Sequence, residues 1–253
     1  MLLPRVIPCL LVRDRKLVKG VEFKRHQYIG DPINAIHVYN EKEVDEIVVL
    51  DIGASLCGSG PDIDYVKQIA SECFMPLAYG GGISTFDQAK QLFKVGVEKI
   101  VLNTHAVDNP DLVTNCASEF GSQSILVSID VIRDAPERYS LYKLCGTRQV
   151  KLDPLEFAMK MEKCGAGELM INSIDRDGNG TGYDLQIIEL IASRVNIPLV
   201  ACGGAGNINH IKAAVRAGAS AAAAGSLFVY YGKRRSVLIN YPTQTELSNL
   251  FLD

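Results

Sequence analysis

Short apolar runs rich in valine, isoleucine and leucine recur along the whole chain, and most are followed by a turn and a segment with apolar residues three and four positions apart. Runs that are apolar at consecutive positions are typical of strands buried on both faces of a parallel sheet, with crossover helices between them. The strands predicted in this way are residues 5–12, 46–52, 75–79, 98–103, 124–131, 168–174, 197–202 and 219–225. The predicted helices are residues 62–72, 85–95, 110–120, 154–164, 185–195 and 208–217.

Eight strands in a chain of 253 residues match the size of a closed (β/α)8 TIM barrel, with an open doubly wound sheet as the alternative. An internal repeat favours the barrel. A shift of 122 positions without a gap places IAS at 69–71 on IAS at 191–193, the glycine pair at 81–82 on the pair at 203–204, and Glu46 on Glu168. We therefore expect a single α/β domain over residues 1–253, a (β/α)8 barrel built from two half-barrel repeats.

The composition excludes several classes of protein. With 47% hydrophobic and 22% charged residues, the chain is an ordinary globular protein and neither disordered nor fibrous. A formal net charge of −3 argues against a nucleic-acid partner bound through a broad basic face. No apolar stretch reaches the roughly 18 residues that span a bilayer. The first residues lack the features of a signal peptide, so we expect neither a membrane partner nor export.

The seven cysteines and four histidines show no metal-ligand spacing. The cysteines are scattered and odd in number, and most lie within apolar runs. We interpret them as small core residues rather than as a disulfide framework. The sequence therefore predicts a cytoplasmic protein with no metal and no cofactor.

Two glycine-rich loops occupy related positions in the two halves, YGGGIS at 79–84 and CGGAGN at 202–207. Glycine lets backbone N–H groups approach an anion, and a following helix N-terminus favours negative charge. The next strand of each half ends in small polar groups, Asn103-Thr104 and Gly225-Ser226. Turn geometry alone explains one such loop, but two at symmetric positions predict two phosphate sites and a substrate with a phosphate at each end.

Three aspartates lie where predicted strands end, at the end of the barrel that holds active sites in this fold. Asp130, in the run ILVSIDVIR, is the candidate general acid–base, and its alternative role is a hydrogen-bond acceptor that anchors a loop. Asp51 follows the second strand, and Asp177 either works in the site or caps a turn. Lys19, in the predicted turn LVKG, is either solvated or faces the substrate.

Motifs spread over nearly the whole chain resemble those of the HisF family, the cyclase subunit of imidazole glycerol phosphate synthase in histidine biosynthesis. They are LVKG, LDI, YGGGI, LNTHAV, FGSQ, SIDRDG, GYD and CGGAG. The resemblance implies a barrel that takes ammonia from a docked glutaminase (HisH-like) subunit and uses it on a bis-phosphate ribonucleotide. By matched position it places one phosphate against Gly82, Asn103 and Thr104, and the other against Asp177, Gly178, Gly204, Gly225 and Ser226. Lys19 and Asp51 complete the predicted substrate-binding set.

The family's mechanism uses two aspartates on opposite sides of the barrel mouth, and this chain matches one of them. Asp130 matches the second, but the first falls at Leu11, where CLLV stands for the family's CLDV. Asp14 cannot replace it through a shifted alignment, because the family also has an aspartate there. A positioned acid or base contributes about 10²–10⁴-fold to a rate. Asn172 and Cys202 also replace hydroxyl side chains, so we expect weakened cyclase activity.

Charged residues at four predicted strand starts match the ring that guards the family's ammonia entrance; they are Arg5, Glu46, Lys99 and Glu168. A salt-bridge layer that only stabilises this face is the alternative.

Segment 227–242, LFVYYGKRRSVLINYP, resembles second-copy HisF-like proteins (WbuZ type) of surface-polysaccharide gene sets. That resemblance implies supply of ammonia to a separate enzyme that amidates a nucleotide-linked sugar. Lys233, Arg234 and Arg235 form either a solvated loop or a contact for that sugar amidotransferase or an anionic substrate.

Three hypotheses about function remain open at this point. The first is an ammonia-channelling synthase subunit in a glutamine-dependent amidation complex. The second is a working cyclase that makes imidazole glycerol phosphate despite Leu11. The third is a non-catalytic scaffold that binds phosphorylated ligands and regulates its partner.

Overall fold

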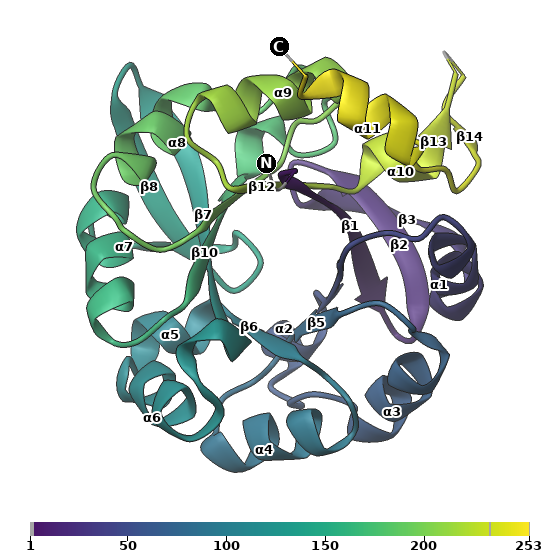
Figure 1. The fold of residues 1–253 in the computed structure, drawn as a ribbon. Coiled ribbons are helices and arrows are strands. Elements are labelled where there is room, and N and C mark those ends of the chain that lie inside the picture. The colour runs from purple at the N-terminus through teal and green to yellow at the C-terminus, as the bar shows by residue number, and fades with distance from the viewer. Residues whose placement is uncertain (1–2, 233, 253) are drawn as a thin grey trace.

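Eight parallel strands close into a barrel in the computed structural model, which describes residues 3–232 and 234–252. The first and last barrel strands pair with each other, as Arg5 with Ala221 and Pro8 with Ala224, which closes the ring and excludes the open sheet. The expected barrel is therefore confirmed, and Figure 1 views it along its axis. Its strands are Arg5–Arg13 (β1), Ile47–Asp51 (β4), Leu77–Gly80 (β5), Lys99–Leu102 (β6), Ile125–Ala135 (β7), Glu168–Ser173 (β10), Leu199–Cys202 (β11) and Ala221–Ala224 (β12).

Helices surround the ring of strands and pack on its outer surface (Figure 1). The six predicted helices are present: Ile63–Glu72 (α3), Phe86–Lys94 (α4), Asp111–Phe120 (α6), Pro154–Lys163 (α7), Leu185–Ala192 (α8) and Ile208–Arg216 (α9). Two further helices were not predicted, Pro32–Glu41 (α1) and Gln244–Leu250 (α11). Short helical turns follow three strands, at Ala54–Cys57 (α2), Thr104–Asp108 (α5) and Ser226–Val229 (α10), and Ser122–Ser124 and Ile174–Arg176 are 3-10 turns.

Two antiparallel hairpins, which the sequence analysis did not predict, extend the first strand of each half. Lys16–Val21 (β2) and Lys24–Gly30 (β3) follow β1, while Arg138–Lys143 (β8) and Arg148–Val150 (β9) follow β7. The assignment of Lys19 to a turn was therefore wrong, because Lys19 lies on β2. A third, small hairpin follows β12 and pairs Tyr230–Tyr231 (β13) with Ser236–Val237 (β14). It contains Arg234 and Arg235, whereas Lys233 lies outside the described residues.

The pairing of the strands shows how the two halves correspond. Leu11 pairs with Leu50 in the first half, and Asp130 pairs with Asn172 in the second. Leu50 and Asn172 are 122 positions apart, so Leu11 and Asp130 are structural counterparts although only 119 positions separate them. The first residues of α1 and α7, Pro32 and Pro154, are again 122 positions apart. The three additional residues of the second half therefore lie in its hairpin.

Apolar side chains fill two separate regions of the molecule. Between the sheet and the helices lies the larger core, which includes the buried rings of Tyr39 and Phe157. Inside the barrel lies a second apolar cluster, formed by Ile7, Cys9, Val48, Ala78, Val101, Leu126, Met170, Val200, Cys202, Ala221 and Ala223. This cluster separates the two open ends of the barrel. Within the described part of the chain, no helix has the length and apolar character needed to cross a membrane.

Candidate functional site

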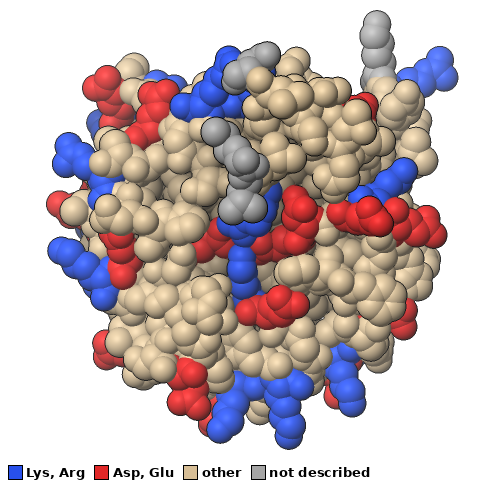
Figure 2. Space-filling view, in the orientation of Figure 1, with Lys and Arg blue, Asp and Glu red and all other residues tan. Residues whose placement is uncertain are grey.

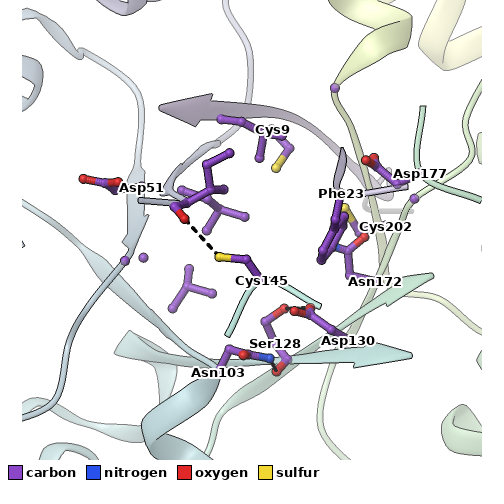
Figure 3. Close-up of a pocket in the computed structure, with 18 of the residues that line it drawn as sticks. Cys9, Phe23, Asp51, Asn103, Ser128, Asp130, Cys145, Asn172, Asp177 and Cys202 are labelled. Atoms are coloured by element: carbon purple, nitrogen blue, oxygen red, sulfur yellow. Dashed lines mark hydrogen bonds between the residues drawn. The ribbon is translucent and has the colours of Figure 1, made fainter. Parts of the chain in front are cut away.

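One cavity opens at the ends of the barrel strands and collects the side chains that the sequence analysis selected (Figure 3). Its lining contains all of the predicted catalytic and substrate-binding positions: Leu11, Lys19, Asp51, Gly82, Asn103, Thr104, Asp130, Asp177, Gly178, Gly204, Gly225 and Ser226. These residues come from all eight barrel strands or the loops that follow them, and from β2. The structure thus brings the predicted positions together, while their roles stay predictions.

Asp130 lies on β7 with its side chain inside the barrel and only 6% of its surface exposed. Ser128, two residues earlier on the same strand, donates a hydrogen bond from Oγ to Oδ1 of Asp130 at 3.0 Å. Burial raises the pKa of Asp130 to about 7, and the negative charge of Asp177 also raises it. A carboxyl group with this pKa can both donate and accept a proton near neutral pH.

The counterpart of Asp130 in the first half of the mouth is Leu11, which packs with Leu50 against the apolar cluster inside the barrel. Neither side chain can transfer a proton. The mouth therefore has a titratable group on the side of β7 and an apolar surface on the side of β1.

Lys19 is buried, with 6% of its surface exposed, so the solvated alternative for this residue is wrong. Its Nζ donates to the carbonyl oxygen of Cys9 at 2.7 Å. A Cβ at Gly225 would lie 1.9 Å from that Nζ, so the ammonium group rests directly on the glycine backbone. Burial raises the pKa of Asp177, and the Lys19 charge opposes this shift. Lys19 thus places a positive charge beside one of the predicted phosphate positions.

The glycines of the two loops are also required by packing. Gly82 has a φ of +67°, and a Cβ there would meet the Ala54 Cβ at 2.9 Å. Its N–H donates to Ser55 Oγ at 3.1 Å. Gly204 has a φ of +109°, and a Cβ there would lie 2.2 Å from the carbonyl oxygen of Gly182. Turn geometry alone therefore explains these glycines, and phosphate binding at them stays a prediction.

Polar residues at the ends of β4 and β6 hold neighbouring loops in place. Oδ1 of Asp51 accepts hydrogen bonds from the N–H groups of Gly53 and Ala54 at 2.9 and 3.1 Å. Burial raises the pKa of Asp51, while these two bonds lower it. Asn103 Nδ2 donates to the Ser128 carbonyl at 3.0 Å, and Thr104 Oγ1 accepts from the Leu144 N–H at 3.1 Å. These bonds connect β4 to α2, and β6 to β7 and its hairpin.

The four charged residues predicted as an ammonia gate form a closed ring of ion pairs at the opposite end of the barrel. Arg5 bonds to both Glu46 and Glu168. Lys99 also bonds to both acids, at 2.8 and 3.0 Å. Both glutamates are buried, whereas the two cations remain partly exposed. Figure 2 views the face at which the strands begin and shows acidic and basic side chains gathered near its middle.

Several residues of the mouth escaped the sequence analysis. Ser128 contacts Asp130 and could have been found from the alternation of inward positions along β7. Phe23 and Cys145 come from the tips of the two unpredicted hairpins and reach the cavity, where Cys145 Sγ donates to the Ile52 carbonyl at 3.1 Å (Figure 3). The thiols of Cys9 and Cys202 hydrogen-bond each other inside the barrel. No local pattern in the sequence indicates these last contacts.

The closed ring of strands, the polar mouth and the charged ring at the base place the chain in the class of (β/α)8 barrel proteins with a site at the strand ends. The family model described as "Histidine biosynthesis protein" matches residues 5–235. A Pseudomonas aeruginosa protein provisionally named imidazole glycerol phosphate synthase subunit hisF2 is 50% identical over 244 residues, which cover 96% of this chain and 97% of the relative. The chain belongs to the HisF family and is a HisF-like synthase subunit.

Other relatives carry related names. A Vibrio vulnificus protein provisionally named imidazole glycerol phosphate synthase subunit hisF3 is 45% identical over 248 residues, covering 97% of this chain and 95% of the relative. The imidazole glycerol phosphate synthase subunit HisF of Alkaliphilus metalliredigens is 43% identical over 231 residues, covering 91% and 92%. The similarity therefore extends over nearly the whole length of both kinds of relative.

Proposed function

We propose that this chain receives ammonia from a HisH-like glutaminase at the ringed end of the barrel and passes it to a separate amidating enzyme at the mouth. The observation that carries the proposal is Leu11, the counterpart of Asp130 by strand pairing. Without a second proton-transfer group, ring closure on a bis-phosphate ribonucleotide lacks a contribution of about 10²–10⁴-fold. We therefore expect the ammonia that enters the barrel to be consumed by a separate enzyme and not by ring closure in this chain.

The two ends of the barrel support a path for a small molecule between the ring and the mouth. Arg5 and Lys99 are 31% and 20% exposed at the ring, so their side chains can move aside for ammonia. The interior beyond the ring is apolar, with Val48, Leu126 and Met170 fully buried. An apolar interior favours neutral ammonia over ammonium, because burying an unpaired charge is costly. We infer that ammonia moves between these packed side chains and is thereby kept from protonation in bulk water.

The names of the relatives support a role for this chain as an additional copy of the synthase subunit, separate from the copy that serves histidine biosynthesis. The hisF2 and hisF3 names mark additional copies of a synthase subunit in their organisms. The word subunit in these names fits a glutaminase partner. We take the acceptor of the ammonia to be a nucleotide-linked sugar of surface-polysaccharide biosynthesis, amidated by a separate sugar amidotransferase.

A direct test supplies the purified chain with the bis-phosphate ribonucleotide and an ammonium salt. We expect imidazole glycerol phosphate formation at least a hundredfold slower than in a HisF subunit that has both aspartates. Turnover near that of an ordinary cyclase contradicts the proposal.

With a co-expressed glutaminase, Lys99→Ala should release more free ammonia for each glutamine hydrolysed, because one cation of the ring is lost. Unchanged release leaves the ring with a structural role alone.

The second candidate function is a cyclase that works with Asp130 as its only carboxyl group. It is favoured by one observation, the pKa of about 7 that lets Asp130 serve as acid and base in turn. Lys19, whose charge acts on Asp177, provides the positive charge for a phosphorylated ligand. The same cyclase assay separates the two functions.

A further inference from the structure

The oxygen of a buried amide in the mouth has no hydrogen-bond partner among the described residues. Asn172 lies near the end of β10 with 7% of its surface exposed, and its Oδ1 accepts no bond from any residue that the structure describes. The side chain lines the mouth cavity, and Figure 3 shows it beside Asp130 and Cys202. Buried polar atoms in folded proteins are almost always paired, so an unpaired amide oxygen facing a cavity indicates a ligand with a hydrogen to donate.

Two carboxylates accompany this amide. Asp130 is the register partner of Asn172 on the neighbouring strand, and both side chains point into the cavity. Ser128 occupies Oδ1 of Asp130, so the other carboxylate oxygen is left for a ligand. Asp177, from the loop after β10, is close enough for its charge to act on Asp130. Three acceptor side chains therefore lie on one side of the mouth.

The charged and titratable groups around these acceptors include Lys19, Cys9, Cys145 and Cys202, in addition to the two aspartates. Lys19 is the nearby cation, and its Nζ already donates to the Cys9 carbonyl at 2.7 Å. The two cysteines hydrogen-bond each other. On the opposite side Leu11 and Leu50 present an apolar surface. Asp177 accepts a backbone hydrogen bond from Phe23 and feels the Lys19 charge. Asn172 Oδ1 and the second carboxylate oxygen of Asp130 are therefore the acceptors left for a ligand.

We propose that Asp130, Asn172 and Asp177 form a binding site for an ammonium ion, which holds ammonia after its passage through the barrel. The inference rests on the proposed function for the source of that ammonia. Water brings hydrogens but no charge, and a potassium ion brings charge but no directed hydrogens, whereas ammonium brings both. A proton moves from the Asp130 carboxyl group to the nitrogen of ammonia and gives ammonium and carboxylate. The reverse transfer releases neutral ammonia, and no other bond changes.

The test measures ammonium binding to the chain alone, without glutaminase. The chain is titrated with ammonium chloride, potassium chloride and tetramethylammonium chloride at constant ionic strength, and binding is followed by calorimetry and by the NMR signal of 15N-ammonium. We expect saturable binding of ammonium, at least tenfold weaker binding of potassium, and no binding of tetramethylammonium. Equal affinity for potassium and ammonium, or no saturable ammonium binding, overturns the site.

Variants identify the residues responsible. Asp130→Asn and Asn172→Leu should each weaken ammonium binding at least tenfold, and Asn172→Asp should strengthen it because a third carboxylate replaces the amide. Asn209→Leu, at an exposed position on α9, is the matched control and should bind as the native chain does. If Asn172→Leu does not fold, Asn172→Ala, which removes the amide oxygen without adding bulk, replaces it in the comparison. Unchanged binding in the folded Asn172 variants overturns the assignment.

The glutaminase-coupled assay distinguishes failure of this site from failure of the proposed function. If glutamine-derived ammonia passes through the barrel but the chain alone binds no ammonium, the ammonium site is wrong and the proposed channel function stands. If the chain binds ammonium but no glutamine-derived ammonia passes, the proposed channel function is wrong and the ammonium site stands.

Discussion

Burial of Asp130 holds its carboxyl group in the protonated form over a pH range in which the unfolded chain has already lost the proton. The pKa is about 7 in the folded protein against an ordinary value of 3.8. The folded state therefore binds more protons than the unfolded state between these values, and stability falls as the pH rises from about 4 to about 7. The full difference corresponds to about 4 kcal/mol.

Asp130→Asn removes this penalty and should raise the free energy of unfolding. The gain should be about 2 to 3 kcal/mol larger at pH 8 than at pH 5, because the folded carboxyl group ionises only near pH 7. Urea unfolding at the two pH values measures it. Asp45→Asn, at an exposed position, is the control and should show no such pH dependence. An equal gain at both pH values contradicts the raised pKa.

Leu11→Asp places a carboxyl group opposite Asp130 and restores the pair that the family's mechanism uses. We expect measurable formation of imidazole glycerol phosphate from the bis-phosphate ribonucleotide and ammonia, at least tenfold above the native chain. Leu11 is partly exposed to the cavity, so the added carboxylate can be hydrated there. Leu11→Asn, which has similar size and no proton to exchange, is the control. If both variants are equally inactive, Asn172 or Cys202 also limits the reaction.

At the scale of elements, the ring at the strand starts is a stabilising unit whatever its role in transport. Glu46 and Glu168 each accept from two cations, and both are buried. Glu46→Gln leaves Arg5 and Lys99 to share one acid. We expect a loss of about 2 kcal/mol in the free energy of unfolding, below the 3–5 kcal/mol of fully buried pairs because the cations are partly hydrated.

The exposed Arg15–Asp62 pair provides the comparison for this prediction. Its side chains are 54% and 38% exposed, so Asp62→Asn should cost less than about 1 kcal/mol from the ion pair. Asp62 also caps α3 by accepting from the Tyr65 N–H, a role that asparagine can keep. If Glu46→Gln costs no more than Asp62→Asn, the ring does not hold this end of the barrel together.

The barrel strands and six helices could be predicted because each has a strong apolar pattern that only one kind of element satisfies. The hairpins could not. β3 reads KRHQYIG and is mostly exposed, so it has no buried face to leave a pattern. The turn between β2 and β3 uses Glu22 and Phe23 at φ values of +53° and +58°, without the glycine that usually marks such a turn. Lys19 was misplaced for this reason.

The residues of the candidate site likewise include some that the sequence predicts and some that it does not. The residues at strand ends, such as Asp51 and Asp130, follow from the position of active sites in barrels. Phe23 and Cys145 reach the mouth from hairpin tips, and only the folded chain reveals that they lie in the same cavity. The unpaired amide of Asn172 is likewise a property of its surroundings and not of any sequence motif.

At the scale of the whole molecule, the two half-barrels share the same arrangement of strands and helices but differ in the residues that they place at the mouth. Strand pairing makes Leu11 and Asp130 counterparts, yet one is apolar and the other titrates. Two identical half-sites would suit a substrate with two similar ends. A one-sided mouth instead suits a site where a small nitrogen species is held on one wall and released into the open cavity.

The two faces of the barrel also differ in what they expose, which leads to a prediction about assembly. Phe74, in the turn between α3 and β5, is 83% exposed on the face that carries the ring, and Leu3 is 45% exposed ahead of β1. Large apolar side chains that are exposed on one face favour a protein interface there. Phe74→Glu should weaken binding of the glutaminase subunit at least tenfold, because a charge replaces a ring that the partner would bury.

Binding of the purified glutaminase to immobilised chain, measured as an equilibrium dissociation constant, checks this. Tyr231→Glu is the control: Tyr231 is 66% exposed on the hairpin after β12, at the opposite end of the barrel. Tyr231→Glu should leave glutaminase affinity unchanged, so that the two variants separate the ringed face from the mouth. If the Tyr231 variant loses affinity and the Phe74 variant keeps it, the glutaminase docks at the mouth, and ammonia cannot travel from the ring to Asp130.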